Sequence, residues 1–548
     1  MYLLAAQHPN DINFADSMFF KVTSILYKFS SYNIIYFRFI GLSIILSSAF
    51  ILFIGIAKYT ASISLKNNRL ESIDILFVII NGTLLYYSLL PTPSYNLLNT
   101  ASVYTGVGLL LFSLSDKFQF NESLRSRIAL ILLGFVITFD FFIKFSSSIM
   151  FLSIVVLVFF LIRKSKNLMY LLLGSGISLL MYFFFIQSVA SWKKIFFDGM
   201  MATTQLNEES IFILLKNNFN QIAIGLKDST ENVFFIIFPL LIQNIIPRKF
   251  KLAYSQVVLL LIFVFLPFVI VYLKLYQGGA WPKVPSEMIL SFFIVSAVIY
   301  LQTQSIFRHL GNINLLILIF LLIITPFVGA IGTGVPIMGG IIECIASWPV
   351  LIYIMNKYLS YYFNNGIYKL LTIYLMLVIT LQVITSETLF PYRLNTSIFD
   401  QKVPISIGDP PSVLNVDTKL ANFFISLRSM INKNKIAKNE KYILAFCDMP
   451  GFVFFLGKRS PSLPWYLGEG QKYNRLILES TPPSLIKHAI IITNPAKNDC
   501  MPDLKEFGID FPKQYSHVGH LEYPRLWWNT DKQMVPIDIW IPSLDHLR

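Results

Sequence analysis

Charged residues are scarce in this chain. Asp, Glu, Lys and Arg make up 14% of its 548 residues, whereas hydrophobic residues make up 55%. Ordinary soluble domains are about a quarter charged, and one globular core cannot hide this much apolar surface. Many apolar runs have about 20 residues, the length of a helix that crosses a hydrocarbon core about 30 Å thick. The composition therefore predicts an integral membrane protein.

Cysteines are few and nucleotide-binding motifs are missing. Cys344, Cys447 and Cys500 are too few for a disulfide framework and include no Cys-x-x-Cys pair. Cys344 falls in an apolar run, where we expect inert packing. The other two fall in the C-terminal tail, where an oxidising compartment could join them, and the sequence leaves that bridge open. No P-loop and no Gly-x-Gly-x-x-Gly after a strand is present, which argues against ATP-driven transport by this chain alone.

Twelve apolar runs predict transmembrane helices. We expect these helices near residues 36–57, 72–91, 95–115, 128–143, 146–163, 168–187, 233–247, 255–274, 287–303, 312–330, 340–356 and 368–385. Basic clusters between them, such as 163–166 and 248–251, fall on one side, which the positive-inside rule makes cytoplasmic. The net charge of +14 then encodes topology and does not indicate a nucleic-acid partner.

The opposite, external side receives the N-terminus, a long segment at 188–232 and the tail. Residues 2–6 are too short to span a bilayer, so nothing visible carries the N-terminus across it, and we expect one further helix upstream. The organisation predicted is a first external loop with an amphipathic helix (1–35), a transmembrane domain (36–385) and an external domain (386–548).

The tail, which begins at about residue 386, changes composition abruptly at Pro391. Short apolar runs at 442–446, 452–456 and 489–493 predict strands, and helical spacing covers 412–432. The last segment, 535–542, alternates and contains prolines, which is typical of an edge strand. The tail is therefore predicted to be a small soluble α/β domain.

Two acids precede the amphipathic segment of the first loop, Asp11 and Asp16. A carboxylate there can deprotonate an attacking hydroxyl or hold a divalent cation against a phosphate. Either acid can instead cap the following helix. These residues alone favour capping over catalysis.

A second polar group stands at the external end of the run 128–143. Asp140 and Lys144 lie four residues apart, on one face of a helix, and ionisable groups at membrane depth are often functional. They can form a simple ion pair, or Lys144 can bind a lipid phosphate while Asp140 orients it. In the turn 91–96, Tyr95 and Asn96 are expected at the external rim, after a cap at Ser94.

Two further segments carry weaker signals. An amphipathic run from Ser210 to Leu226, inside the loop 188–232, is expected to lie at the interface or fold over a cavity. His517 and His520 have a spacing that metal ligands use, but the sequence offers no third ligand, so metal binding there is not favoured.

These parts together resemble the polytopic glycosyltransferases of the GT-C superfamily, as in dolichyl-phosphate-mannose-protein mannosyltransferase-like and aminoarabinose-transferase-like proteins. The resemblance rests on an acid in the first loop, an amphipathic helix, Arg38 at the start of the next span, Lys144 before Phe145-Ser-Ser-Ser, a long external loop and an external α/β domain. The tandem acidic pair of many members is absent here.

The resemblance implies a polyprenyl-phosphate-linked sugar as donor and a glycan, lipid or protein hydroxyl as acceptor. Asp16 would be the general base, with Asp11 as the second candidate. Lys144 would neutralise the departing phosphate beside Asp140, and Arg38, Tyr95 and Asn96 would complete the substrate site. Whether a divalent cation takes part in the reaction stays open at this stage.

Two other functions stay open at this stage. A polymerase or ligase of surface polysaccharide also uses lipid-linked glycans, and a transporter of lipid-linked glycans would place charges near the bilayer midplane. The richness in Ile, Asn and Lys suggests a bacterial inner membrane, with the C-terminal domain external.

Overall fold

The computed structural model describes most of the chain. The described residues are 2–12, 17–63, 72–87, 92–115, 123–163, 166–186, 193–194, 196–199, 201, 216–230, 233, 283–302, 313–332, 337–363, 366–389, 391, 394, 396–447, 449–462, 466, 471–497, 500–524 and 534–543. The expected helices at 233–247 and 255–274 lie outside this set, apart from residue 233.

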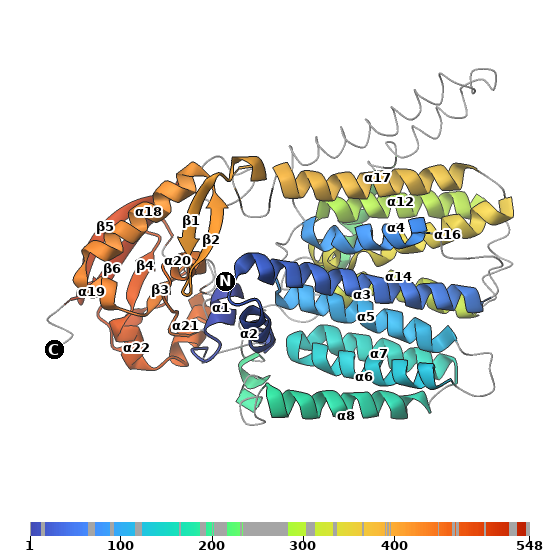
Figure 1. Cartoon of the computed structure of the whole chain (residues 1–548), viewed down its shortest axis with the longest axis horizontal. Helices are drawn as coiled ribbons and strands as arrows, with labels where there is room; N and C mark the ends of the chain where they lie inside the picture. The colour runs from blue at the N-terminus through green and yellow to red at the C-terminus, as the bar shows by residue number, and fades with distance from the viewer. Residues whose placement is uncertain are drawn as a thin grey trace, which may run out of the picture.

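Long helices lie side by side in a bundle, and a smaller α/β domain sits at one end of it (Figure 1). The bundle helices are α3 (Ile34–Ser62), α4 (Ser72–Gly82), α5 (Tyr95–Ser115), α6 (Leu124–Ile143), α7 (Phe145–Leu161), α8 (Asn167–Phe185), α12 (Lys283–Gln302), α14 (Ile313–Ala330), α16 (Ser347–Phe363) and α17 (Gly366–Leu389). A 3-10 helix, η1 (Thr83–Tyr87), follows α4. Ten of the twelve expected helices thus correspond to helices of the bundle.

Five of the described helices are long and apolar enough to cross a membrane: α3, α5, α6, α8 and α14. A sixth span is added if α15 (Ile337–Gly340) and η4 (Ile341–Cys344) are joined to α16 across a bend of 68°. The protein is therefore a helical membrane protein with a C-terminal α/β region. That all twelve expected helices cross the membrane stays a prediction.

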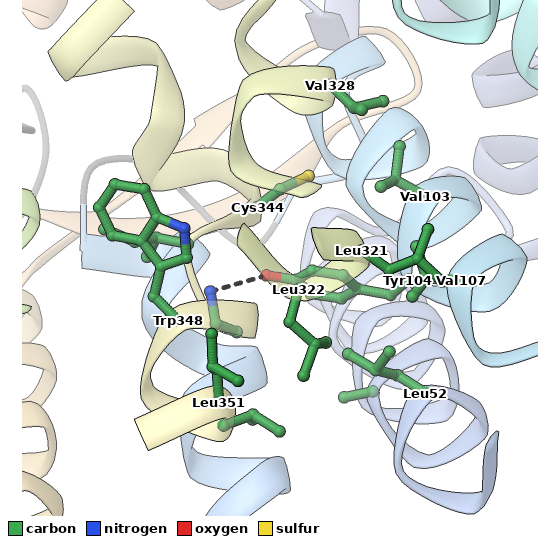
Figure 2. Close-up of a cluster of buried hydrophobic side chains, with 14 of the residues drawn as sticks. Leu52, Val103, Tyr104, Val107, Leu321, Leu322, Val328, Cys344, Trp348 and Leu351 are labelled. Atoms are coloured by element: carbon green, nitrogen blue, oxygen red, sulfur yellow. Dashed lines mark hydrogen bonds between the residues drawn. The ribbon is translucent and has the colours of Figure 1, made fainter. Parts of the chain in front are cut away.

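The bundle core is apolar and close-packed. Tyr104 lies among residues of α3, α5, α14 and α16, and its hydroxyl accepts a hydrogen bond from the amide of Ala346, at 3.3 Å (Figure 2). Cys344 is fully buried in this core, as expected for inert packing. Trp348 donates its indole N–H to the carbonyl of Ile323, at 3.0 Å.

Glycines bring helices α6 and α8 into backbone contact. A Cβ atom on Gly134 of α6 would collide with the carbonyl of Leu171 on α8, and one on Gly174 of α8 would collide with the carbonyl of Ile131 on α6. The two helices therefore pack through a reciprocal glycine pair, as small residues allow in membrane proteins.

The α/β domain is built on a four-stranded sheet of order β3-β4-β6-β5. Its strands are β3 (Ile443–Ala445), β4 (Ile490–Thr493), β5 (Tyr515–Pro524) and β6 (Met534–Pro542), with β3 and β4 parallel and the other pairs antiparallel. Helices α18 (Thr418–Lys433), α19 (Lys435–Asn439), α20 (Pro450–Phe455), α21 (Gln471–Glu479) and α22 (Pro483–His488) belong to the same domain. Cys447 and Cys500 form a disulfide with Cα atoms 5.4 Å apart, which answers the question left open by the sequence.

Three predictions within this domain are wrong. The run 452–456 falls mostly in helix α20, which begins with Pro450 in its first turn, and a short apolar run does not distinguish the two states. Residues 412–416 form strand β2, which pairs with β1 (Val403–Ile407), so the helix starts only at Thr418, after the cap Asp417. β6 is an inner strand and not an edge strand, because it lies between β4 and β5. Its prolines are tolerated there since β4 pairs with it only at residues 538–540, away from them.

The N-terminal hairpin of α1 (Tyr2–Gln7) and α2 (Phe19–Phe29) lies between the bundle and the α/β domain (Figure 1). Ala5 and Phe19 belong to the apolar core of the bundle. Leu4 and Tyr27 belong to the core that α18 and α20 share with the sheet. The hairpin therefore packs into both parts of the molecule.

Candidate functional site

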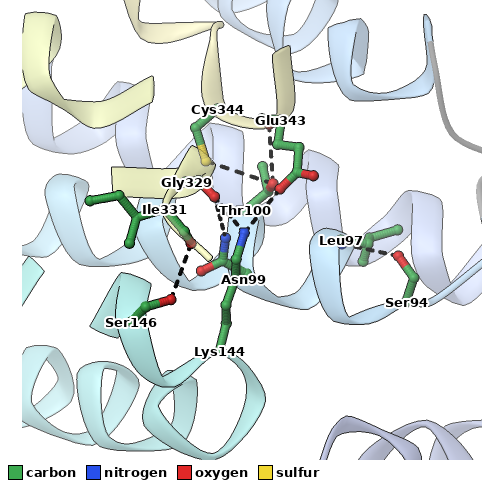
Figure 3. Close-up of polar contacts among 10 residues, drawn as sticks. All are labelled: Ser94, Leu97, Asn99, Thr100, Lys144, Ser146, Gly329, Ile331, Glu343 and Cys344. Atoms are coloured by element: carbon green, nitrogen blue, oxygen red, sulfur yellow. Dashed lines mark hydrogen bonds and ion pairs between the residues drawn. The ribbon is translucent and has the colours of Figure 1, made fainter. Parts of the chain in front are cut away.

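Lys144 is buried at the end of the bundle that faces the α/β domain. Helix α6 ends at Ile143, and Lys144 leaves the helical conformation, with φ −147° and ψ 87°. Its side chain, 4% exposed, reaches across to α14 and η4. The ammonium donates to the carbonyl of Gly329 at 2.5 Å and lies 3.4 Å from the Glu343 carboxylate (Figure 3).

A network of short polar contacts holds these groups in place. Asn99 on α5 donates to the same Gly329 carbonyl, at 3.4 Å, and Thr100 donates to the carbonyl of Glu343, at 3.1 Å (Figure 3). Ser146 donates to the carbonyl of Ile331, at 3.2 Å. The corner between α6 and α7 is thus tied to the segment that runs from α14 to η4.

Asp140 does not pair with Lys144 in the way that the spacing of four suggested. Asp140 is 2% exposed, and its Oδ1 has no hydrogen-bond partner among the described residues. Its backbone carbonyl accepts the amide N–H of Lys144, at 2.6 Å. Because α6 ends one residue before Lys144, the two side chains do not share a helical face. The ion-pair partner is Glu343 instead.

Tyr95 borders the same region. Ser94 caps α5 by accepting from the amide of Leu97, at 3.2 Å, as expected. The Tyr95 ring lies 5.9 Å from the ammonium of Lys144 and 5.9 Å from the ring of Phe19 on α2. Asn96, in the first turn of α5, is buried, and its Oδ1 has no hydrogen-bond partner among the described residues.

The first loop reaches this region directly. The Ser17 hydroxyl donates to the carbonyl of Ile143 at 2.6 Å, and the amide of Met18 donates to the carbonyl of Phe142 at 3.1 Å. These two bonds fix the chain at the last turn of α6, immediately before Lys144. Asp16, the first candidate base, lies outside the described residues.

Asp11 is described, and it faces the α/β domain. Its carboxylate lies 3.4 Å from the guanidinium of Arg459, and both side chains are partly exposed. It does not cap α2, since the N-cap of that helix is Met18 and the side chain that accepts from the first amide of the helix, that of Phe19, is Ser17, at 3.4 Å. Nearby, burial first and then the charge of Arg459 lower the pKa of His8 from its ordinary value of 6.5.

Arg38 lies one turn into α3. Its Nε donates to the hydroxyl of Thr92 at 3.4 Å, and the carboxylate of Glu387 on α17 lies within electrostatic range. Arg38 therefore faces α17, whereas Lys144 faces α14 and η4.

Part of the long loop covers the segment that carries Glu343. Residues 216–230 are helical, and Gly225 lies against Met338 of α15. Ser291 of α12 donates to the carbonyl of Ser229, at 2.7 Å. The described part of the amphipathic run thus packs on the bundle near the buried ion pair.

Metal binding finds little support in the described part of the chain. His517 and His520 approach one oxygen of Asp538, at 3.4 and 2.8 Å. Among the residues that the structure describes, however, no group of three or more His, Cys, Asp or Glu side chains could hold a metal ion.

Glu343 was missed from the sequence. The signal was present, because it is an acid inside the apolar run Ile341-Ile-Glu-Cys-Ile-Ala, and such residues mark internal polar sites. Its partner lies 199 residues away along the chain, a pairing that spacing alone cannot show. Ser17 was missed for the same reason.

Comparisons with known proteins find similarity at the level of structure only. No family model matches the chain, and no curated protein matches it. The Archaeoglobus fulgidus oligosaccharyltransferase, in a complex with zinc and sulfate, is similar to it with a TM-score of 0.43 and 10% identity over 90% of this chain and 63% of that chain. The same enzyme tethered to an acceptor peptide that contains an NVT sequon gives a TM-score of 0.42 and 12% identity, over 100% of this chain and 72% of that one. The chain thus spans under two thirds of the first of these chains.

Proposed function

We propose that this chain is a membrane glycosyltransferase, which moves a sugar from a polyprenyl-phosphate donor to an acceptor hydroxyl on the side of the membrane where the α/β domain lies. The observation that carries the proposal is the attachment of Ser17 and Met18 to the last turn of α6. Ser17 follows Asp16 directly in the sequence, and its bond to Ile143 holds it next to Lys144. This attachment supports the proposal that the first-loop acid acts together with Lys144.

The chemistry proposed needs an acid and a cation on opposite sides of the anomeric carbon. The acceptor oxygen forms a bond to that carbon, and Asp16 takes the proton of the attacking hydroxyl. The bond between the carbon and the phosphate oxygen breaks, and its electron pair leaves with the lipid phosphate. Lys144 has one N–H without a partner among the described residues, and that N–H would stabilise the charge that develops on the phosphate.

The remaining predicted residues would shape the donor site. The Tyr95 ring would form a wall beside the ammonium, and the unpartnered Oδ1 of Asn96 would accept a donor hydroxyl. Asp140 would act through the backbone, since its carbonyl receives the amide of Lys144. A divalent cation on the first-loop acids stays a separate proposal.

The side on which the reaction takes place is also proposed. The disulfide in the α/β domain is typical of an oxidising compartment. The C-terminal ends of α3 and α7 point away from that domain (Figure 1), and Lys58 lies in the last turns of α3 while Arg163 follows α7 by two residues. Both features favour an external α/β domain on a bacterial inner membrane. A reporter that is active only outside the cytoplasm, fused after Arg548, should therefore be active. An inactive reporter would place the site on the cytoplasmic side.

The deciding experiment measures release of sugar from a radiolabelled polyprenyl-phosphate sugar by the purified chain. Asp16→Asn should abolish release without lowering protein yield or melting temperature. Asp11→Asn is the matched control, because its carboxylate is already engaged by Arg459, and it should keep most of the activity. If Asp11→Asn abolished release and Asp16→Asn kept it, Asp11 would be the general base. No release across several sugars would favour the polymerase, ligase or transporter functions instead.

A further inference from the structure

Arg38 and Glu387 carry opposite charges at the same end of the bundle but do not touch. Glu387 lies within electrostatic range of Arg38, yet among the described residues Arg38 makes a single hydrogen bond, to Thr92, and no ion pair. Glu387 makes neither a hydrogen bond nor an ion pair within the described part of the chain. Both side chains are partly buried. Charges in this position need partners, and the described residues supply them incompletely.

Both residues stand at the boundary with lipid. Arg38 shares its side of α3 with Ile35, which is 49% exposed, and is followed by Phe39, which is 59% exposed. On α17, Ile384 precedes Glu387 by three residues and is 53% exposed. Large exposed apolar side chains on a membrane helix face the acyl chains.

The depth of the two residues matches that of lipid head groups. Arg38 is four residues from the start of α3, and Glu387 is two residues from the end of α17. At about 1.5 Å per residue, both lie within about 6 Å of their helix ends. These ends meet on the side of the bundle that carries the α/β domain (Figure 1).

A buried hydroxyl adds a third polar group. Tyr86 of η1 is 5% exposed, its hydroxyl has no hydrogen-bond partner in the part of the chain that the structure describes, and it lies within electrostatic range of Glu387. η1 packs on α17. A guanidinium, a carboxylate and a phenol hydroxyl thus come together where three elements meet the lipid.

We propose that Arg38 and Glu387 bind the head group of a zwitterionic aminophospholipid, with its phosphate on Arg38 and its protonated amine on Glu387. A guanidinium offers several N–H donors to phosphate oxygens, and a carboxylate accepts from a primary ammonium. An anionic lipid without an amine would satisfy Arg38 but leave Glu387 opposed by a like charge. Only a head group that has both charges and a primary ammonium can neutralise both residues and also donate a hydrogen bond to Glu387. This proposal assigns Arg38 to the lipid head group instead of the sugar-donor site that the resemblance implied, because Arg38 faces α17 and not the Lys144 region. The site therefore does not depend on the proposed glycosyl transfer.

The test compares purified full-length protein in nanodiscs of phosphatidylcholine alone, with added phosphatidylethanolamine, or with added phosphatidylglycerol. Phosphatidylethanolamine should raise the melting temperature above both other bilayers, as expected for a ligand of the folded state. Choline cannot donate a hydrogen bond, and glycerol carries no positive charge. Arg38→Gln and Glu387→Gln should each remove the rise.

Arg127→Gln is the matched control, since Arg127 lies over the ring of Tyr170 at the opposite end of α6, and it should keep the rise. Native mass spectrometry should find phosphatidylethanolamine retained by the wild type and lost from both site variants. An equal rise with phosphatidylglycerol would overturn the proposal, as would a rise that persists in the site variants. The coupling energy between Arg38→Gln and Glu387→Gln can also be measured in each bilayer. A coupling as large in phosphatidylcholine alone as with phosphatidylethanolamine would show a direct ion pair and would also overturn the proposal.

Discussion

The buried pair of Lys144 and Glu343 should respond sharply to the loss of one partner. Their side chains are 4% and 6% exposed, and the ammonium also bonds the carbonyl of Gly329. Removing one member of such a pair leaves a charge without compensation, which typically costs about 3–5 kcal/mol. Lys144→Met should therefore lower the free energy of unfolding by about that amount.

The double variant gives the sharper result. Replacing a buried ion pair by apolar residues of similar volume is often neutral, so Lys144→Met combined with Glu343→Leu should recover most of the stability lost in Lys144→Met. The assay is denaturant titration in detergent micelles, followed by tryptophan fluorescence.

A surface pair provides the control for this cycle. Arg475 and Glu479 lie 2.9 Å apart on α21 and are about half exposed, and such pairs contribute only about 0.3–0.5 kcal/mol. Arg475→Met should thus change stability little. If Lys144→Met were also within about 1 kcal/mol of wild type, or if the double variant were less stable than both single variants, the argument for a compensated buried pair would be refuted.

Three further predictions concern other parts of the fold. Gly174→Ala should destabilise the bundle strongly, because its Cβ would collide with the carbonyl of Ile131, whereas Gly176→Ala, with open space around it, should be nearly neutral in the same melting assay. Cys447→Ser with Cys500→Ser should destabilise the α/β domain by about 4 kcal/mol, from the loop of 53 residues that the bridge closes; an unchanged melting temperature under reducing conditions would contradict this. Burial lowers the pKa of His8 below 6.5, so the folded state binds fewer protons than the unfolded state, and stability should fall as the pH drops below about 6.5. His8→Gln should weaken that dependence, and an unaltered melting curve between pH 7 and 5.5 would count against it.

The membrane helices could be predicted well because their signal is one of length and composition. The runs 95–115 and 312–330 match α5 and α14 almost residue for residue, since a spanning helix must be apolar over its whole length. The α/β domain was harder. Short apolar runs such as 452–456 fit a strand or a buried helix, and only the tertiary context decides between them.

The candidate site also contains residues that the sequence could predict and residues that it could not. Lys144 could be found because a lone charge beside an apolar run is conspicuous, and Ser94 could be found because capping is local. The partner of Lys144 could not be predicted. Asp140 is near it in the sequence, but α6 ends at Ile143, so the two side chains do not share a helical face. Glu343 lies close to Lys144 only because α5, α14 and η4 pack together.

The hairpin of α1 and α2 also constrains the order in which the protein can mature. Leu4, Ala6 and Tyr27 of the hairpin, with Ile34 and Phe37 of α3, belong to a core whose remaining members begin at Ile405, almost 400 residues later in the chain. During that interval the hairpin exposes an apolar face that has no partner from its own chain, and such surfaces promote misassembly. Contacts of this sequence separation also slow folding. The α/β domain can therefore reach its final packing only on a bundle that has already been inserted, which makes docking onto the N-terminus the last step of assembly.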